Sequence, residues 1–86
     1  MIDRLKRLRF RAWHRGTREA DYMIGGFFDR YSPVWGETEI AWFEAMVEED
    51  DVDIMAWALG TAAPPAHLDR PDLIAAMRRL DYIPLP

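Results

Sequence analysis

The sequence contains no cysteine, and this absence removes several kinds of chemistry at once. Without thiols the chain has no disulfide, no thiolate metal site and no cysteine nucleophile, a composition suited to a reducing compartment. It also lacks the run of roughly 20 apolar residues that crosses a bilayer, and its first residues lack the apolar region of a signal peptide. We therefore expect a cytoplasmic chain without stable membrane insertion.

Groups that commonly catalyse reactions are also scarce. Serine occurs once, at Ser32 before a proline, and the two histidines, His14 and His67, are far apart in sequence. Neither a dinucleotide-binding glycine fingerprint nor a phosphate-binding loop is present, and the histidines lack zinc spacing. The acidic segment 50–53 lacks the glycine and terminal glutamate of a calcium loop, so helix capping is its expected role. The sequence predicts a protein that is not an enzyme and binds no metal.

The chain has 86 residues, half of them apolar, which suffices for one domain with a modest core. No repeat or linker divides it. We expect a monomer with a single helical domain over residues 1–82 and a mobile tail over 83–86, because Pro84 and Pro86 cannot continue a helix.

Apolar residues recur at steps of three and four, which predicts an all-α fold, a compact five-helix bundle. Four helices are expected over residues 3–13, 18–31, 37–49 and 52–59, and a fifth begins after Asp69 as its N-cap, with Leu73, Ala76, Met77 and Leu80 facing inward. Gly16 should interrupt the first helix and Gly60 should end the fourth. Asp51 is the expected N-cap of the fourth.

Two features of these helices bear on packing. Gly25 and Gly26 lie inside the apolar stripe of the second helix, where each costs about 1 kcal/mol relative to alanine. We favour a close approach of a neighbouring helix there over a bend. Among the tryptophans, Trp57 is expected in the core, whereas Trp42 falls off the stripe of its helix and should be partly exposed, as Trp35 is also a candidate to be.

The charge is strongly asymmetric. Residues 1–18 contain seven of the eleven basic side chains and one acid, whereas residues 37–53 contain eight acids and no base. Such a dipolar chain can steer toward a partner of complementary charge. A basic helix packed beside an acidic one explains the same pattern, and the sequence leaves both interpretations open.

A dense cluster of functional groups lies at the corner between the first two helices. Arg15, Arg18, Glu19 and Asp21 surround Gly16. Glycine lets a foreign backbone approach closely, and the planar guanidinium of Arg15 suits carboxylates or phosphates. The alternative is a capped corner in which Glu19, placed in the first turn of a helix, reaches back to Arg15. Chemistry alone does not separate a docking site from a structural corner.

The segment Arg15-Gly16-Thr17-Arg18-Glu19 resembles the RGxxE motif of the succinate dehydrogenase assembly factors. The resemblance extends over about residues 7–60 and includes Asp21, the pair Phe27-Phe28, and the acidic segment before Trp57. Ala20, Val52 and the Gly25-Gly26 pair depart from the family pattern and affect packing rather than the motif.

The resemblance implies an assembly chaperone. Its partner would be the flavoprotein subunit of succinate dehydrogenase or, in some bacteria, of fumarate reductase, and it would promote covalent attachment of FAD to that subunit. FAD would be the client's cofactor, with none bound stably by this chain. Carried over to this sequence, Arg15, Gly16 and Glu19 form the contact surface, and the surrounding contacts come from Arg18, Asp21, Arg11 and His14.

Other functions compete with this one. The basic side chains of residues 4–11, interleaved with Phe10 and Trp13, resemble a nucleic-acid-binding stripe or the surface of an antitoxin-like protein. The acidic character of the whole chain and the lack of a base-reading helix speak against nucleic acid. A membrane-surface anchor is disfavoured because the apolar face of the first helix is narrow.

Overall fold

The computed structural model describes residues 2–77 and contains helices and no strand within that range. The five α-helices are α1 (Ile2–Trp13), α2 (Arg18–Tyr31), α3 (Glu37–Met46), α4 (Asp51–Leu59) and α5 (Pro71–Met77). Short 3-10 turns at Ser32–Val34 and Ala66–Leu68 join them. The all-α five-helix prediction is confirmed. Leu80 and the tail predicted at 83–86 lie outside the described residues.

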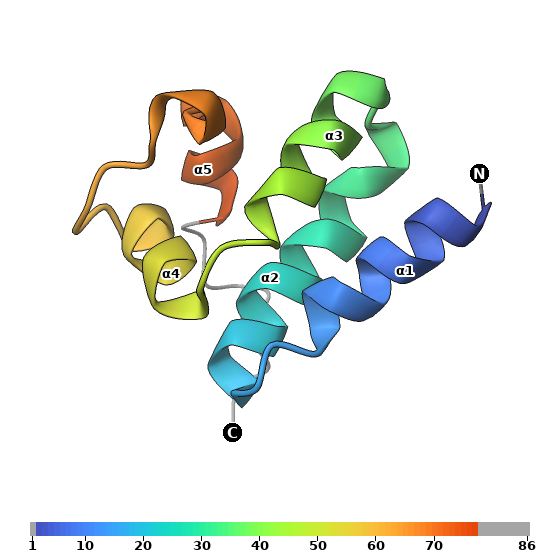
Figure 1. Cartoon of the computed structure of the whole chain (residues 1–86), viewed down its shortest axis with the longest axis horizontal. Helices are drawn as coiled ribbons and strands as arrows, with labels where there is room; N and C mark the ends of the chain where they lie inside the picture. The colour runs from blue at the N-terminus through green and yellow to red at the C-terminus, as the bar shows by residue number, and fades with distance from the viewer. Residues whose placement is uncertain (1, 78–86) are drawn as a thin grey trace.

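Helix α2 occupies the centre of the bundle (Figure 1). It packs against α1 on one side and α5 on the other, while α4 packs against α5. Its predicted stripe explains this position, since Ala20, Met23, Ile24 and Phe27 are all buried. Burial of one continuous apolar face on several neighbours is the main stabilising contribution in a bundle of this size.

The core is rich in aromatic rings that pack on Phe43. This ring is fully buried, and its centroid lies 5.3 Å from that of Phe28 and 5.9 Å from that of Phe27. Trp57 is buried as expected, and Trp35 is half-buried against the cluster. Aromatic contacts of this kind add to the stabilisation that comes from buried area.

The expectation that Trp42 is partly exposed is wrong. Its side chain is only 6% exposed, and its indole Nε1–H donates to the carbonyl of Leu68 at 2.9 Å. The turn Ala66–Leu68 therefore covers the ring and satisfies its polar group.

Gly25 lies where α1 and α2 approach closely. A Cβ on this residue would lie 2.3 Å from Cδ2 of Trp13, so only glycine leaves room for the indole. The indole is also fixed by a hydrogen bond from its Nε1 to Asp29 at 3.2 Å. Helix α2 continues through this point without a break, which confirms close packing rather than a bend at Gly25.

Two predicted helix caps are wrong. Asp51 is the first residue of α4, not its N-cap, and its carboxylate accepts a hydrogen bond from Arg15. Helix α5 begins at Pro71, later than a cap at Asp69 requires. Proline suits the first helical position because its missing N–H has no intrahelical acceptor there. Asp51 thus lies inside α4 and Asp69 lies two residues before α5, so neither is the N-cap of its helix.

Other boundaries agree better with the sequence. Gly60 ends α4 with a left-handed backbone, φ +82°, as predicted. Helix α3 ends at Met46, three residues before the predicted end, and the intervening residues form a turn.

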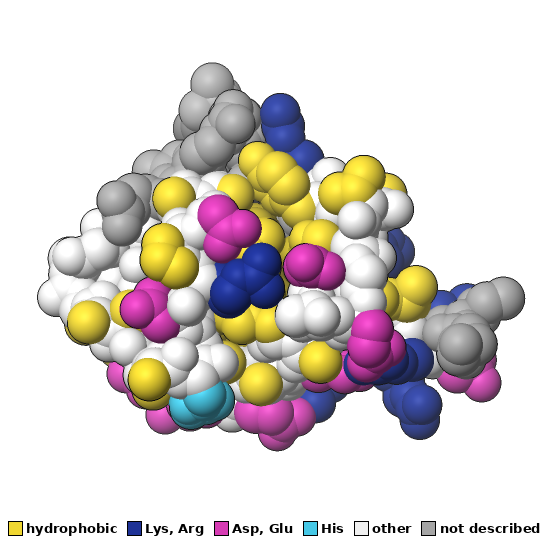
Figure 2. All heavy atoms as spheres, turned by 90° about the horizontal axis from the view of Figure 1, so that it is seen from above, with side chains coloured by type: hydrophobic (Ala, Val, Ile, Leu, Met, Phe, Trp, Pro, Cys, Tyr) yellow, Lys and Arg dark blue, Asp and Glu magenta, His cyan; other side chains and the backbone are white. Residues whose placement is uncertain are grey.

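The basic first helix lies against acidic side chains. The guanidinium of Arg4 contacts Glu37 at 2.7 Å and Glu44 at 2.6 Å, both on α3. Further ion pairs join Arg9 to Asp29 at 2.9 Å and Arg11 to Glu48. The second interpretation of the charge asymmetry, a basic helix packed beside an acidic one, is confirmed. Figure 2 shows one face of the molecule, on which acidic and basic side chains adjoin and apolar ones are scattered among them.

These ion pairs predict an acid-sensitive stability. Hydrogen bonds from Arg4 lower the pKa of Glu37 and of Glu44 below the ordinary value of 4.5. A carboxylate with a lowered pKa stabilises the fold above pH 4.5, and this contribution disappears as the pH falls through the lowered value. Arg4→Gln should therefore lower the melting temperature near neutral pH, and its difference from wild type should shrink as the pH falls.

The measurement is thermal unfolding by circular dichroism between about pH 7 and pH 3, at low and at high salt. Because the pairs are exposed to solvent, added salt should reduce the difference as well. A difference between wild type and variant that stays constant over the whole pH range would show that these pairs do not stabilise the fold.

Candidate functional site at the corner between α1 and α2

The predicted motif forms the connection between α1 and α2. Gly16 has a positive φ of +111°, a conformation that other residues rarely adopt, and it lets the chain reverse after α1. Thr17 is the N-cap of α2, and its Oγ1 accepts a hydrogen bond from the backbone N–H of Ala20 at 3.2 Å. The interruption predicted at Gly16 is confirmed.

Asp21 holds the connection from the α2 side. Its Oδ1 accepts a hydrogen bond from the backbone N–H of Arg15 at 2.6 Å. The carboxylate lies in the first turn of α2, where the helix dipole favours a negative charge. Asp21 is half-buried, so its main contact is within the chain.

Arg15 joins the corner to the loop between α3 and α4. Its Nε donates to Asp51 at 2.6 Å, its Nη1 to the carbonyl of Val47 at 2.9 Å, and its Nη2 to the carbonyl of Glu49 at 2.9 Å. Carbonyls after a helix end have no intrahelical partner and need one. The planar guanidinium satisfies two of them and a carboxylate together.

These contacts change the interpretation of Arg15. Its side chain is only 10% exposed, and its donors are occupied by acceptors of the same chain. The alternative of a capped corner pairs Arg15 with Glu19, but in the structure Asp51 takes that place. Arg15 therefore shapes the corner from within, and a direct contact with a partner stays a prediction.

Three predicted residues do face solvent at the corner. Gly16, Arg18 and Glu19 are exposed, and the side chains of Arg18 and Glu19 make no hydrogen bond or ion pair with the described residues. No neighbouring atom lies within 4 Å of the position of a Cβ on Gly16. The corner thus presents one bare stretch of backbone beside two side chains of opposite charge.

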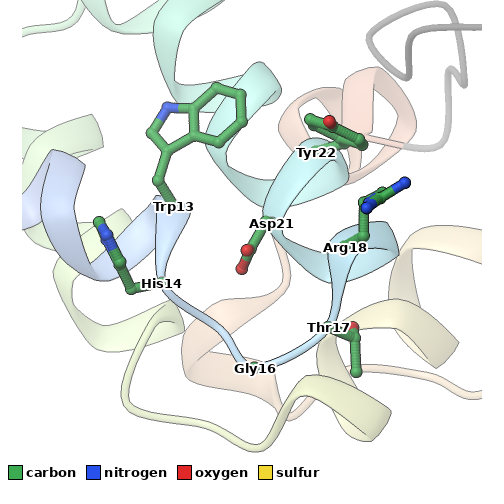
Figure 3. A pocket seen from close by; sticks show the side chains of 7 residues that line it. All are labelled: Trp13, His14, Gly16, Thr17, Arg18, Asp21 and Tyr22. Carbon is green, nitrogen blue, oxygen red and sulfur yellow. The ribbon is translucent and has the colours of Figure 1, made fainter.

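A hollow of about 550 Å³ lies beside this corner (Figure 3). Figure 3 shows Asp21 at its centre, with Trp13 on one side and Tyr22 and Arg18 on the other. The rings of Trp13 and Tyr22 meet edge to face, with centroids 6.0 Å apart. The hollow is lined by Trp13, His14, Gly16, Thr17, Arg18, Asp21 and Tyr22.

The remaining predicted residues lie apart from each other. His14 is exposed at the rim of the hollow, and its Nδ1 donates to the carbonyl of Phe10 at 2.7 Å. Arg11 does not line the hollow, and it points instead to Glu48. The structure brings His14 to the candidate site and places Arg11 in an internal ion pair.

Sequence reasoning missed two contributors to the site. Tyr22 lies four residues after Arg18 and so shares its helix face, a spacing that could have revealed it. The sequence predicts Asp51 as a helix cap, and nothing local indicates its contact with Arg15. Within residues 2–77 no cluster of acidic or histidine side chains could hold a metal, and no helix there has the length and apolarity of a membrane span.

Comparison with known proteins gives two matches. The family described as flavinator of succinate dehydrogenase matches residues 6–81. The FAD assembly factor SdhE of Acetobacter pasteurianus is 36% identical over 70 residues, which cover 81% of this chain and 64% of that protein. The chain thus spans less than two thirds of the relative's length. No solved structure matches. With both the motif and most of its length matched, the chain belongs to the family of flavinators of succinate dehydrogenase.

Proposed function

We propose that this protein is an assembly factor that binds the flavoprotein subunit of succinate dehydrogenase and promotes covalent attachment of FAD. The observation that supports this best is the exposed corner: Gly16, Arg18 and Glu19 face solvent on a turn that Arg15 and Asp21 hold in place. A related chain is an FAD assembly factor by name. The flavoprotein of fumarate reductase is a second client of the same kind.

The protein acts by binding and not by catalysis. Covalent flavin attachment is chemistry of the flavin and its own subunit, in keeping with the general division of work between cofactor and protein. A rigid surface that binds one arrangement of the flavoprotein raises the population of that arrangement. Rigidity at the corner reduces the conformational entropy lost on binding. We take the factor to act as a cytoplasmic monomer.

The charge distribution supports a protein partner over nucleic acid. Arg4, Arg9, Arg11 and Arg15 are paired with acids of the same chain. Arg7 interacts electrostatically with Glu44, and among the described residues of α1 and the corner only Lys6 and Arg18 have no acidic partner. Binding to a phosphate backbone depends on many free cations, and this surface offers few.

Glu19→Gln is the sharpest test of the proposal. Glu19 is exposed and makes no internal contact, so the variant should keep its stability while it removes one charge from the corner. We expect covalent flavin in the client to fall by about tenfold when the variant replaces wild type at limiting amounts. The measurement is in-gel flavin fluorescence of the denatured flavoprotein subunit, since covalent flavin survives denaturation.

Asp69→Asn is the matched control, because Asp69 is also exposed but lies in the connection before α5. A second pair of variants is Gly16→Arg and Gly16→Ala, which share the cost of a positive φ but differ in how far they protrude. Normal flavin content with both Glu19→Gln and Gly16→Arg would show that the corner is not the contact surface.

A further inference from the structure

Phe10 is a large apolar side chain that is exposed to solvent and does not belong to the hydrophobic core. It is 61% exposed, whereas Leu8 and Ala12, on the inner face of α1, are 3% and 0% exposed. Two residues along a helix correspond to about 200° of rotation, so Phe10 lies on the opposite face from Leu8. A large aromatic side chain left in water contributes little to stability, and exposed aromatics are enriched at binding surfaces.

The Phe10 ring is held in a fixed position. The ring of His14 stacks on it with centroids 3.9 Å apart and an interplanar angle of 18°. The hydrogen bond from His14 Nδ1 to the Phe10 carbonyl fixes the imidazole in that place. A side chain that is already ordered loses little entropy when a partner binds.

This pair lies between two hollows. The second hollow has a volume of about 270 Å³ and is lined by Lys6, Arg9, Phe10, Trp13 and His14. It shares Trp13 and His14 with the hollow at the corner. We call Phe10, Trp13 and His14 the aromatic ridge. The ridge and the two hollows form one surface that runs along the outer side of α1 to the start of α2.

Free positive charges lie at both ends of this surface. Lys6 lines the hollow at one end, Arg18 lines the hollow at the other, and neither is paired with a described residue. Arg7 is exposed next to Lys6 and interacts electrostatically with Glu44 on α3, so it adds no free charge to this surface. Of the acids nearby, Asp29 binds Arg9 and Asp21 binds the backbone of Arg15, whereas Glu19, next to Arg18, has no partner among the described residues.

We propose that the aromatic ridge is a second contact surface, which binds an acidic segment of the flavoprotein client. In that segment a large apolar side chain packs on the ridge, and carboxylates on either side of it reach Lys6 and Arg18. The inference rests on the proposed function and adds a contact beyond the corner. A protein segment fits better than a bilayer, because the hollows admit side chains and a single exposed aromatic inserts only weakly into lipid.

The test is the affinity of the full chain for the purified flavoprotein subunit, measured by isothermal titration calorimetry. Phe10→Ser should weaken binding by about 30-fold, as expected for a central aromatic contact. Lys6→Gln combined with Arg18→Gln should weaken binding by about tenfold at low salt and by much less at high salt. The matched control is Val34→Ser, which removes an apolar side chain that is 86% exposed in the turn after α2.

The outcomes separate the two proposals. If wild type does not bind the flavoprotein, the proposed function fails. If wild type binds and Phe10→Ser binds within about twofold of it, the ridge is not a contact and the inference fails while the function stands. Binding to vesicles of anionic phospholipid is measured for the same proteins. If Phe10→Ser loses binding to the vesicles but not to the flavoprotein, the ridge is a lipid contact and the inference is overturned. Equal melting temperatures of wild type and Phe10→Ser verify that the fold is intact.

Discussion

Arg15→Ala is expected to lower the free energy of unfolding by about 3 kcal/mol. The variant removes the guanidinium but leaves its three acceptors, so Asp51 and the carbonyls of Val47 and Glu49 lose their partner in a region where Arg15 itself is 10% exposed. Leaving buried or half-buried acceptors without a hydrogen bond is more destabilising than removing a whole interaction. In a domain of this size the change corresponds to a fall of about 15 °C in melting temperature.

Arg18→Ala is the natural control for this variant. Arg18 belongs to the same motif but is exposed and unpaired, so its removal should change stability by less than about 0.5 kcal/mol. Chemical denaturation followed by circular dichroism measures both variants. In a double-mutant cycle with Asp51→Ala, the two single changes should be strongly non-additive. Equal stabilities of Arg15→Ala and Arg18→Ala would contradict an internal role for Arg15.

Gly25→Ala is expected to destabilise the fold by about 2 kcal/mol, although alanine is the better helix former by about 1 kcal/mol. The new methyl group would lie 2.3 to 2.6 Å from ring atoms of Trp13. The indole cannot move away freely, because its Nε1 binds Asp29 and its ring packs on Tyr22. The clash therefore outweighs the gain in helix propensity.

Thermal unfolding and near-ultraviolet circular dichroism measure this effect, since displacement of Trp13 alters the aromatic signal. Gly36→Ala is the control, because its Cβ would meet Glu39 at an ordinary distance of 3.5 Å. Combining Gly25→Ala with Trp13→Leu should remove much of the penalty that Gly25→Ala carries alone. A stabilised Gly25→Ala variant would mean that the two helices can separate at little cost.

Patterns local to one helix predicted the fold well. The apolar stripe of α2, the glycine that ends α4 and the close approach at Gly25 all follow from the spacing and type of neighbouring residues. Trp42 shows where such reasoning stops. Its exposure depends on the turn that contains Leu68, 26 residues later, and the period of α3 contains no information about that turn.

The candidate site was predictable to a similar degree. The motif marks the corner, and the positive φ of Gly16 follows from the residue type. Which side chains of the motif are internal and which are exposed does not follow from sequence. Arg15 turns inward to Asp51, 36 residues away, while Glu19 stays in solvent. Phe10 lay in a stretch interpreted as a basic stripe, and its stacking on His14 emerged only in three dimensions.

The contacts of Arg15 make the conformation of the motif depend on the tertiary fold. Its guanidinium reaches the turn after α3 and the start of α4, so the corner acquires its shape only when α1 to α4 are packed together. An isolated peptide that contains the motif has its sequence but lacks the partners of Arg15, and therefore does not form the surface of the corner. Transient opening of the turn after α3 would release Arg15 from its acceptors, and the corner would lose its conformation although the turn itself is not part of it. The proposed function then predicts that the factor binds its client only while it is itself fully folded.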